Sequence, residues 1–329
     1  MTVIVTGADG QDGTLLTRLL VERGETVLGI GRGGPIDITD PHAVARLVAE
    51  LRPSRVYLLA AVQHSAQDPP MAAHELAHAA HRVNTLQVHN FAEAVSHHSP
   101  DTRIFYAASA HIYGSAIDSG TGIAVRDEDS PIQPRSVYAL TKAAGLLACR
   151  IHRARGVYAA AGILFNHESP LRPEKFVSRK IVRAVAAIVR GTADELVVGR
   201  LDAGADWGYA PDYVRAMSAV LDLDEPEDFV VATGVHHTVA DFCAEAFGAV
   251  GLDWTRYVRE EPTLLTRREP AMVGNARRLR ERTGWAPTVN FREMVRLMLA
   301  AEGVEPTREP NAPTTRPMPV RAGRTEGNT

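Results

Sequence analysis

A tyrosine and a lysine four residues apart are the side chains whose types and spacing most readily do chemistry. Tyr138 and Lys142, in the segment YALTK, would lie one above the other on a helix face. A lysine beside a phenol stabilises the phenolate, so the tyrosine can accept a proton from an alcohol near neutral pH. Ser109, at the end of an earlier apolar segment, can hydrogen-bond the same alcohol. Taken alone, the pair is also compatible with two ordinary helix residues.

A histidine follows this serine in the turn ASAHIYG, residues 108–114. His111 is a candidate acid–base group, because an unperturbed imidazole has a pKa of about 6.5 and accepts or returns a proton near neutral pH. The alternative is that His111 only fills space. We expect a chemical role, because loop positions at the ends of buried strands commonly carry function.

Three glycines spaced GxxGxxG stand near the N-terminus in TGADGQDGTLL. Gly7, Gly10 and Gly13 directly follow an apolar β-branched segment and open a helical one. In that context glycine lets backbone N–H groups approach a pyrophosphate at the helix N-terminus. The pattern predicts dinucleotide binding, with Asp12 in the turn and Ala60 at the end of a later strand assigned to the same site. A glycine-rich connection without a ligand is the alternative.

The second strand ends in GIGRGG, with Arg32 and no carboxylate. An acidic residue there suits the ribose of NAD, whereas an arginine suits the 2′-phosphate of NADP. The sequence therefore favours NADP, with NAD also possible and a surface arginine as the alternative. Asp37, a few residues further on, is a candidate acceptor for the adenine amine.

Alternating elements must position these residues. Short apolar segments that predict strands alternate with amphipathic segments that predict helices; the strands are 3–7, 26–31, 55–61, 103–109 and 157–166, and the helices are 13–23, 40–53 and 136–155. This alternation is typical of the α/β class, with a doubly wound parallel sheet, the Rossmann fold.

We expect a dinucleotide-binding domain of residues 1–166, to which roughly 205–236 return. A smaller C-terminal substrate domain would hold residues 167–204 and 237–303. Residues 304–329 are rich in proline and poor in large apolar side chains, so they are expected to form a disordered tail.

The composition excludes several classes of function. The chain has 329 residues, 45% of them hydrophobic, and a formal net charge of −3, so neither nucleic acid nor an anionic membrane is an expected partner. No apolar stretch approaches the roughly 20 residues of a membrane helix. Two cysteines, Cys149 and Cys243, make no disulfide framework, and a cytoplasmic location is expected.

The segment HELAH matches the HExxH pattern of zinc proteases. A helix would bring His74, His78 and His81 to one side, with Glu75 as a possible base. The chain has 13 histidines, so a chance match is easy, and we expect no metal site.

Longer stretches resemble the extended short-chain dehydrogenase/reductase family, and within it the GDP-mannose 4,6-dehydratases. The stretches that carry this resemblance are VTGADGQDGTLL, PRSVYALTKA, GILFNHESPLRPEKFVSRKI, DWGYAPDYVRAM, EPEDFVVATG and GWAPTVNFREMVRLML. The resemblance implies a nucleotide-sugar enzyme, a lyase or isomerase, with a bound nicotinamide cofactor and a GDP-hexose substrate such as GDP-mannose. It also implies a dimer or a tetramer. Because this chain lacks a long insertion that the family has after the second strand, we expect a homodimer that forms through the helix of Tyr138.

The same resemblance assigns site residues. Ser109, Tyr138 and Lys142 match the family's catalytic serine or threonine, tyrosine and lysine. Substrate contacts are implied for a further group of residues, namely Asn166, Glu168, Arg172, Lys180 and Arg268 (or its neighbour Arg267).

Three departures from the family pattern leave the exact reaction open. His111 stands where the family has the glutamate that removes the C5 proton of a 4-keto sugar. A long insertion after the second strand is missing, and Ala205 replaces an arginine. We expect a 4,6-dehydratase acting through a 4-keto intermediate. The alternatives are a C5 or C4 epimerase of a GDP-hexose and, more remotely, a non-catalytic NADP-binding sensor.

Overall fold

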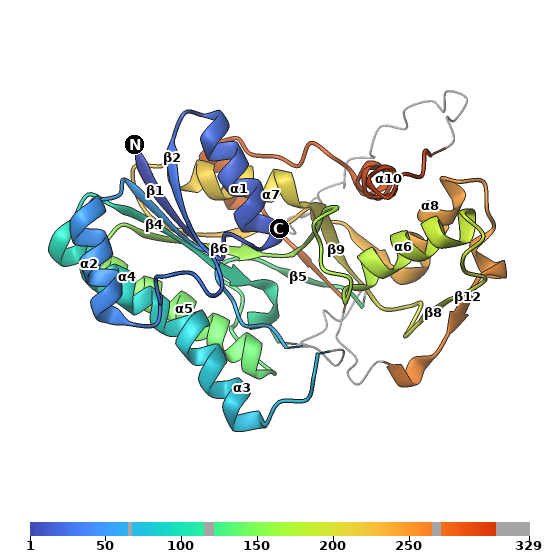
Figure 1. Cartoon of the computed structure of the whole chain (residues 1–329), viewed down its shortest axis with the longest axis horizontal. Helices are drawn as coiled ribbons and strands as arrows, with labels where there is room; N and C mark the ends of the chain where they lie inside the picture. Colours follow the sequence, from blue (N-terminus) through green and yellow to red (C-terminus); the bar gives the residue numbers. More distant parts are fainter. Residues whose placement is uncertain (65–67, 115–121, 265–270, 307–329) are drawn as a thin grey trace, which may run out of the picture.

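The computed structural model describes residues 1–64, 68–114, 122–264 and 271–306. Its centre is a six-stranded sheet in which every neighbouring pair is parallel (Figure 1). The strands run in the order β10 (Asp228–Val231), β6 (Ala159–Leu164), β4 (Arg103–Ser109), β3 (Arg55–Leu58), β1 (Thr2–Thr6) and β2 (Thr26–Ile30). The predicted doubly wound parallel sheet is confirmed.

The strand order reverses beside β1, which has β2 on one side and β3 on the other. In open α/β sheets, ligands bind outside the carboxyl ends of the strands at such a switch point. The third strand was predicted to reach residue 61, but β3 ends at Leu58. Residues 59–63 instead leave the sheet and line a cavity at this edge.

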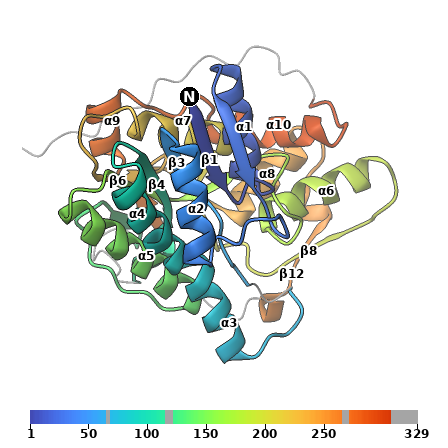
Figure 2. The same ribbon diagram turned by 60° about the vertical axis from the view of Figure 1, so that its left-hand side comes forward.

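Helices cover both faces of the sheet (Figures 1 and 2). On one face α2 (Pro41–Leu51), α4 (Gln87–His98) and α5 (Val137–Ala154) pack into one apolar core. On the other face α1 (Gln11–Glu22), α7 (Ala210–Val220) and α9 (Arg277–Thr283) pack into a second. Because both faces are buried, the inner strands are almost continuously apolar, as parallel strands usually are.

The start of α5 is fixed beside the end of β4. The Ser136 side chain caps the helix by accepting the N–H of Ala139, a contact that favours a helix start there. Further along, Gly145 permits a close approach, because a Cβ at this position would collide with the Tyr106 hydroxyl of β4. These contacts hold the first turn of α5, which carries Tyr138, against the strand end that carries Ser109.

A π-helical turn connects two helices on this side of the sheet. Helix α3 (Ala73–Ala80), which projects beyond the sheet in Figure 2, continues through the π-helix η1 (His81–Leu86) into α4. Asn84 in this turn donates to the Val62 carbonyl at 3.1 Å and to the Thr141 hydroxyl at 2.9 Å. The turn thereby ties the segment after β3 to α5.

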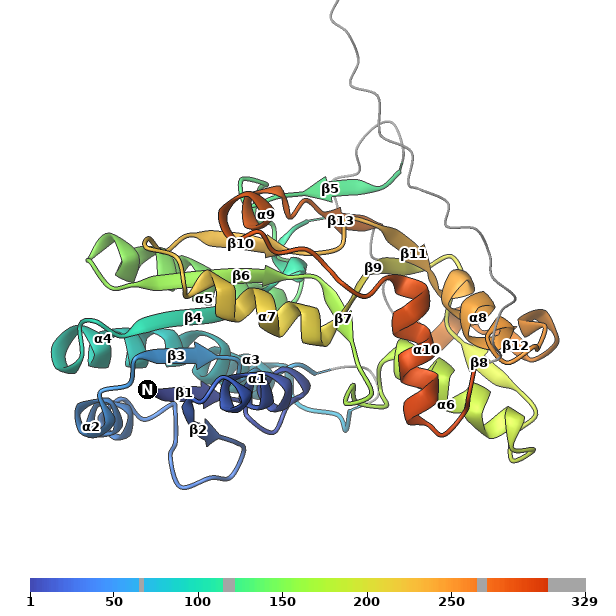
Figure 3. The same cartoon turned by 90° about the horizontal axis from the view of Figure 1, so that it is seen from above.

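A smaller lobe lies beyond the carboxyl ends of the strands (Figure 3). Its helices α6 (Val177–Val189), α8 (Val239–Gly248) and α10 (Phe291–Ala301) share a third apolar core. Short strands form three further sheets. In the first, β9 (Gly204–Tyr209) lies between β11 (His236–Thr238) and β7 (Asn166–Glu168). The other two are the pairs of β12 (Val258–Glu260) with β8 (Leu196–Val198) and of β13 (Met272–Gly274) with β5 (Ala124–Arg126). The 3₁₀ turns are η2 (Ala110–Ile112), η3 (Trp254–Arg256) and η4 (Pro262–Leu264).

A buried carboxylate joins the lobe to the sheet. Asp206 of β9 accepts the backbone N–H groups of Thr233, Gly234 and Gly274 at 2.9, 2.8 and 3.1 Å. Those groups follow β10 and end β13, so one side chain satisfies backbone donors from both.

Two apolar cores flank the sheet and the third lies in the lobe, but α9, which was predicted to belong to the substrate domain, packs into a core beside the sheet. The division into a dinucleotide-binding domain and a substrate domain stays a prediction. Of the expected tail, only residues 304–306 are described; Val304 is buried, and its N–H donates to the Leu299 carbonyl. Residues 307–329 lie outside the described residues. None of the described helices is both long and apolar enough to cross a membrane.

Candidate active site

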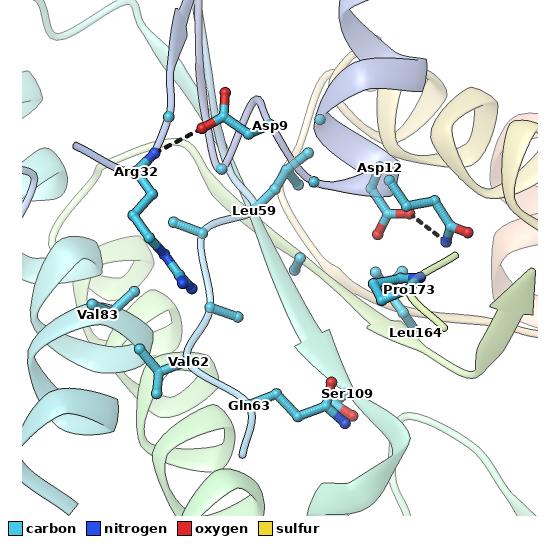
Figure 4. A pocket seen from close by; sticks show the side chains of 18 of the residues that line it. Asp9, Asp12, Arg32, Leu59, Val62, Gln63, Val83, Ser109, Leu164 and Pro173 are labelled. Carbon is cyan, nitrogen blue, oxygen red and sulfur yellow. Dashed lines mark hydrogen bonds between the residues drawn. The ribbon is translucent and has the colours of Figure 1, made fainter. Parts of the chain in front are cut away.

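A cavity of about 880 Å³ opens at the carboxyl ends of β1, β3, β4 and β6. Figure 4 shows Arg32 and Val83 on one side of it and Asp12 and Pro173 on the other. The residues predicted for cofactor, catalysis and substrate that line this cavity are Gly7, Gly10, Asp12, Gly13, Arg32, Asp37, Ala60, Ser109, His111, Tyr138, Lys142, Asn166 and Arg172.

The turn between β1 and α1 has no room for a side chain at Gly7, and the start of α1 has none at Gly13. Gly7 has a φ of +70°, and a Cβ there would lie 2.8 Å from the Cα of Ala60. A Cβ at Gly13 would collide with the carbonyl oxygen of Gly7. The exposed backbone at the N-terminus of α1 is therefore a cradle of the kind that accepts a pyrophosphate.

The far end of the cavity carries Arg32. Its backbone N–H donates to the Asp9 carboxylate at 2.9 Å, and its side chain extends towards Val83 (Figure 4). One carboxylate oxygen of Asp37 accepts both the N–H and the hydroxyl of Thr39, at 2.8 and 2.7 Å. These hydrogen bonds lower the pKa of Asp37. The adenine contact proposed for Asp37 stays a prediction.

The four candidate catalytic residues converge from three adjoining elements. Ser109 ends β4, His111 lies in η2, and Tyr138 and Lys142 lie in α5. The rings of His111 and Tyr138 meet edge to face, with centroids 5.9 Å apart. The N–H of His111 lies 3.3 Å from the Ser109 hydroxyl oxygen, to which it donates.

Lys142 makes its hydrogen bond to the backbone, so its stabilisation of the Tyr138 phenolate stays a prediction. The Lys142 ammonium donates to the Ala107 carbonyl at 2.7 Å and lies 5.9 Å from the Tyr138 ring centroid. Burial lowers the pKa of Lys142 to about 8. Burial also raises the pKa of Tyr138, and this outweighs the opposing effects of the Ser109 hydrogen bond and the Arg172 charge. Lysine proximity on a helix face does not by itself make the phenol acidic here, because both groups are desolvated.

Three of the five predicted substrate residues belong to β7 and the segment after it. Asn166 and Arg172 line the cavity, whereas Glu168 is buried behind them. Its carboxylate accepts the Ser178 hydroxyl at 2.6 Å and lies 3.1 Å from Nε of Arg172. The Arg172 guanidinium also stacks 3.6 Å above the Phe176 ring. Glu168 therefore holds Arg172 in place, and its predicted direct contact with substrate has no support in this geometry.

The remaining two predicted substrate residues do not lie in this group. Lys180, in α6, is not among the residues that line the cavity. Arg268 and its neighbour Arg267 lie outside the described residues. Lys175, which the sequence reasoning passed over, does line the cavity and pairs with Asp68 at 2.8 Å.

A buried ion pair in the cavity wall was also missed. Nε2 of His167 lies 2.9 Å from a carboxylate oxygen of Asp12, and the imidazole stacks on Tyr213 with centroids 4.5 Å apart. Burial alone would lower the pKa of His167, but the charge and hydrogen bond of Asp12 raise it. Burial likewise opposes ionisation of Asp12, but His167 and Gln11 hold its pKa below the ordinary value. Only the position of His167 beside Asn166 could have drawn attention to it.

The HELAH segment forms most of α3. His74, Glu75, His78 and His81 are all exposed. Throughout the described ranges, no group of three or more histidine, cysteine, aspartate or glutamate side chains could hold a metal ion.

The Asp12–His167 pair predicts a pH-dependent contribution to stability. The pair is fully ionised above the ordinary pKa of Asp12, 3.8, and below that of His167, 6.5. Replacing His167→Gln should therefore cost about 2 kcal/mol near pH 5.5, and the cost should shrink as the pH rises through the raised pKa of His167. Urea unfolding of both proteins at pH 5.5 and pH 9 measures this difference, and an equal cost at both values would contradict it.

Comparison with known proteins identifies the family. Residues 35–298 match the family described as GDP-mannose 4,6 dehydratase. The chain is 35% identical to GDP-mannose 4,6 dehydratase 1 of Arabidopsis thaliana, over 90% of this chain and 88% of that protein. It is 30% identical to the GDP-mannose 4,6 dehydratase of Homo sapiens, over 94% and 93% of the two chains.

Solved structures share the fold. RMD from Pseudomonas aeruginosa, complexed with NADPH, has a TM-score of 0.78 and 21% identity over 92% of this chain and 98% of its own. The UDP-glucose 4-epimerase of Thermus thermophilus, complexed with NAD, has a TM-score of 0.74 and 23% identity over 92% and 99%. The fold and the sequence matches agree, and the chain belongs to the GDP-mannose 4,6-dehydratase family.

Proposed function

We propose that the protein is an NADP-dependent enzyme that removes water from GDP-mannose across C5 and C6 by way of a 4-keto sugar. The family match over residues 35–298 carries this proposal. Family membership favours dehydration over the epimerisation that the sequence left open, and an enzyme over a sensor. The free, buried thiols of Cys149 and Cys243 support a reducing cytoplasm as the compartment.

The cavity suits a dinucleotide with an additional phosphate. The glycine turn would hold the pyrophosphate at the N-terminus of α1, and Arg32 would hold the 2′-phosphate of NADP. The complex of the Pseudomonas protein with NADPH supports this choice, while the NAD complex of the Thermus epimerase keeps NAD as the second candidate. When bound, the oxidised nicotinamide would accept a hydride from C4 of the sugar and return it to C6 after water has left, with C5 regaining a proton from solvent, so that the cofactor ends the cycle oxidised.

Tyr138 is the proposed base for the C4 hydroxyl. Its phenolate form takes the hydroxyl proton as the C4–H bond is broken, and Ser109 donates a hydrogen bond to the forming ketone oxygen. Burial raises the pKa of Tyr138, so the phenolate needs nearby positive charge. The Arg172 charge acts in that direction and supports a role of this residue in catalysis as well as in substrate binding.

His111 is the proposed base for C5. A ketone at C4 acidifies the C5 proton, which His111 accepts; the imidazolium then returns a proton to the C6 hydroxyl, and the C6–O bond breaks to release water. The edge-to-face contact with Tyr138 supports this role, because it puts the imidazole next to the group that acts at C4. In the family pattern a glutamate performs the same two proton transfers at this position.

Removing the phenol oxygen should stop the reaction. Tyr138→Phe is expected to lower turnover of GDP-mannose by at least about a hundredfold while leaving NADPH bound, because only the proton acceptor is lost. Product formation is followed by mass spectrometry and retained cofactor by fluorescence. Val21→Glu, an exposed substitution in α1 away from the cavity, is the matched control. Turnover by Tyr138→Phe at the control rate would overturn the assignment.

The role of His111 is tested in D₂O with GDP-mannose. The parent protein is expected to yield a product that has lost water and carries deuterium at C5. His111→Gln should lower kcat by about a hundredfold or more, whereas His111→Glu, which installs the family's base, should recover part of the loss. A product with deuterium at C5 and no loss of water would identify an epimerase instead. Equal rates for His111→Gln and the parent would remove His111 from the mechanism.

We also propose a homodimer built on α5. Leu140, Leu147 and Ile151 of this helix are 50%, 45% and 49% exposed and recur at a spacing that puts them on one stripe. An exposed apolar stripe of this kind suits a two-fold helical interface. In sedimentation experiments Leu147→Glu is expected to yield monomers while Val21→Glu remains dimeric. Identical sedimentation of the parent and both variants would contradict the proposed interface.

A further inference from the structure

The phosphate-binding turn and the strand that carries Asn166 are joined by three side-chain contacts. Nε2 of Gln11 donates to the His167 carbonyl at 3.1 Å, and the Ser169 hydroxyl donates to Oε1 of Gln11 at 2.8 Å. The third contact is the pair between His167 and Asp12. Gln11 and Asp12 are the first two residues of α1, so the helix N-terminus is fastened directly to β7.

The partners of His167 define its protonation state. Nδ1 lies 2.7 Å from the Phe165 carbonyl oxygen, and Nε2 lies 2.9 Å from the Asp12 carboxylate. A carbonyl and an ionised carboxylate only accept hydrogen bonds, so both ring nitrogens must carry a proton. His167 is therefore an imidazolium, and only 10% of its side chain is exposed.

Asp12 occupies a position where another negative charge is expected. Its side chain is 22% exposed and lines the cavity beside the glycine turn (Figure 4). The N-terminus of a helix favours negative charge, but a carboxylate in its first turn repels a pyrophosphate that binds the N–H groups of that turn. The charge of Asp12 must therefore be cancelled before this turn can bind a dinucleotide tightly.

The other groups around the Asp12–His167 pair do not neutralise the charge of Asp12 in place of His167. Arg172, after β7, also lowers the pKa of Asp12, but its effect is smaller than that of His167, which hydrogen-bonds the carboxylate as well. On α5, Lys142 donates to a backbone carbonyl and Tyr138 is a neutral phenol. Tyr213 of α7 stacks on the imidazole and is kept neutral by burial.

We propose that the His167 imidazolium neutralises Asp12 at the N-terminus of α1 and thereby sets the affinity of the glycine turn for the pyrophosphate of the cofactor. His167 is a positioning residue in this inference: it acts on the ligand through Asp12 and does not need to touch it. The inference rests on the proposed binding of a dinucleotide.

A pair of variants separates charge from structure. NADPH affinity is measured by fluorescence titration at pH 6.5 for the parent, His167→Gln and the double variant Asp12→Asn/His167→Gln. Loss of the imidazolium alone should weaken NADPH binding by about tenfold or more, because Asp12 is left uncompensated. The double variant should regain most of the affinity. Binding of adenosine, which has no phosphate, should be the same in all three.

The pH dependence of NADPH binding by the parent protein is a second test, and it needs no substitution of His167. NADPH affinity should fall as the pH rises through the raised pKa of His167, while adenosine affinity should stay level. Lys142, whose pKa is about 8, titrates in the same range. The fall should therefore disappear in the double variant, which keeps Lys142.

The outcomes distinguish this inference from the proposed function. If the parent binds neither NADPH nor NADH at any pH, both are overturned. If the parent binds NADPH but His167→Gln binds it equally well, or the affinity does not change with pH in the parent or still falls in the double variant, only the role of His167 is overturned. If His167→Gln and the double variant are equally weak, His167 has a structural role alone, which also contradicts the proposal.

Discussion

The site depends on how the chain leaves β1 and β3 at the point where the two strands separate. The backbone donors that no longer pair in the sheet are satisfied by one buried hydroxyl: Thr6 accepts the N–H groups of Leu59 and Ala60 at 3.1 and 3.2 Å. Thr6 in turn donates to Gln87, whose amide donates to the Ala60 carbonyl at 2.8 Å. Buried backbone groups are costly when unpaired, so this network fixes the split. The split allows Gly7 to lie against Ala60 and leaves the carboxyl edge open for a ligand.

This hydrogen-bond network explains why the sequence predicted the strands of the sheet but not the residue at which β3 ends. Alternating apolar strands and amphipathic helices depend on local periodicity, and each expected strand of the sheet is present in the structure. The segment YLLAA reads as an unbroken strand, yet β3 stops at Leu58. What ends it are Thr6 and Gln87, which are 53 and 27 residues away in the chain from Leu59 and Ala60 respectively. No local pattern contains that information.

The candidate site likewise has residues that the sequence could predict and electrostatic properties that it could not. Gly7, Ser109 and Tyr138 could be predicted because each follows a recognisable element, and chain topology brings the ends of parallel strands to one edge. The charge states and ion pairs of the site could not be predicted, because they depend on which side chains are buried together. Lys142 donates to the Ala107 carbonyl, and Glu168, expected to contact substrate, is buried against Arg172. Likewise, the partner of Asp12 is 155 residues away.

Burial also decides what the cavity presents to a ligand. Its carboxylates already accept hydrogen bonds within the protein: Asp9 from the Arg32 N–H, Asp37 from Thr39, and Asp12 from His167 and Gln11. A ligand in the cavity would therefore meet the glycine-turn backbone and the Arg32 and Arg172 side chains. The second oxygen of Asp37, which lies 3.8 Å from Arg82, is the acceptor predicted for the adenine amine. Under the proposed function a dinucleotide and a nucleotide-sugar would each bring a pyrophosphate to this cavity, and its walls would then have to contribute more donors than acceptors. The acidic residues of this site therefore act mainly as internal hydrogen-bond acceptors that hold neighbouring donor groups of the protein in position.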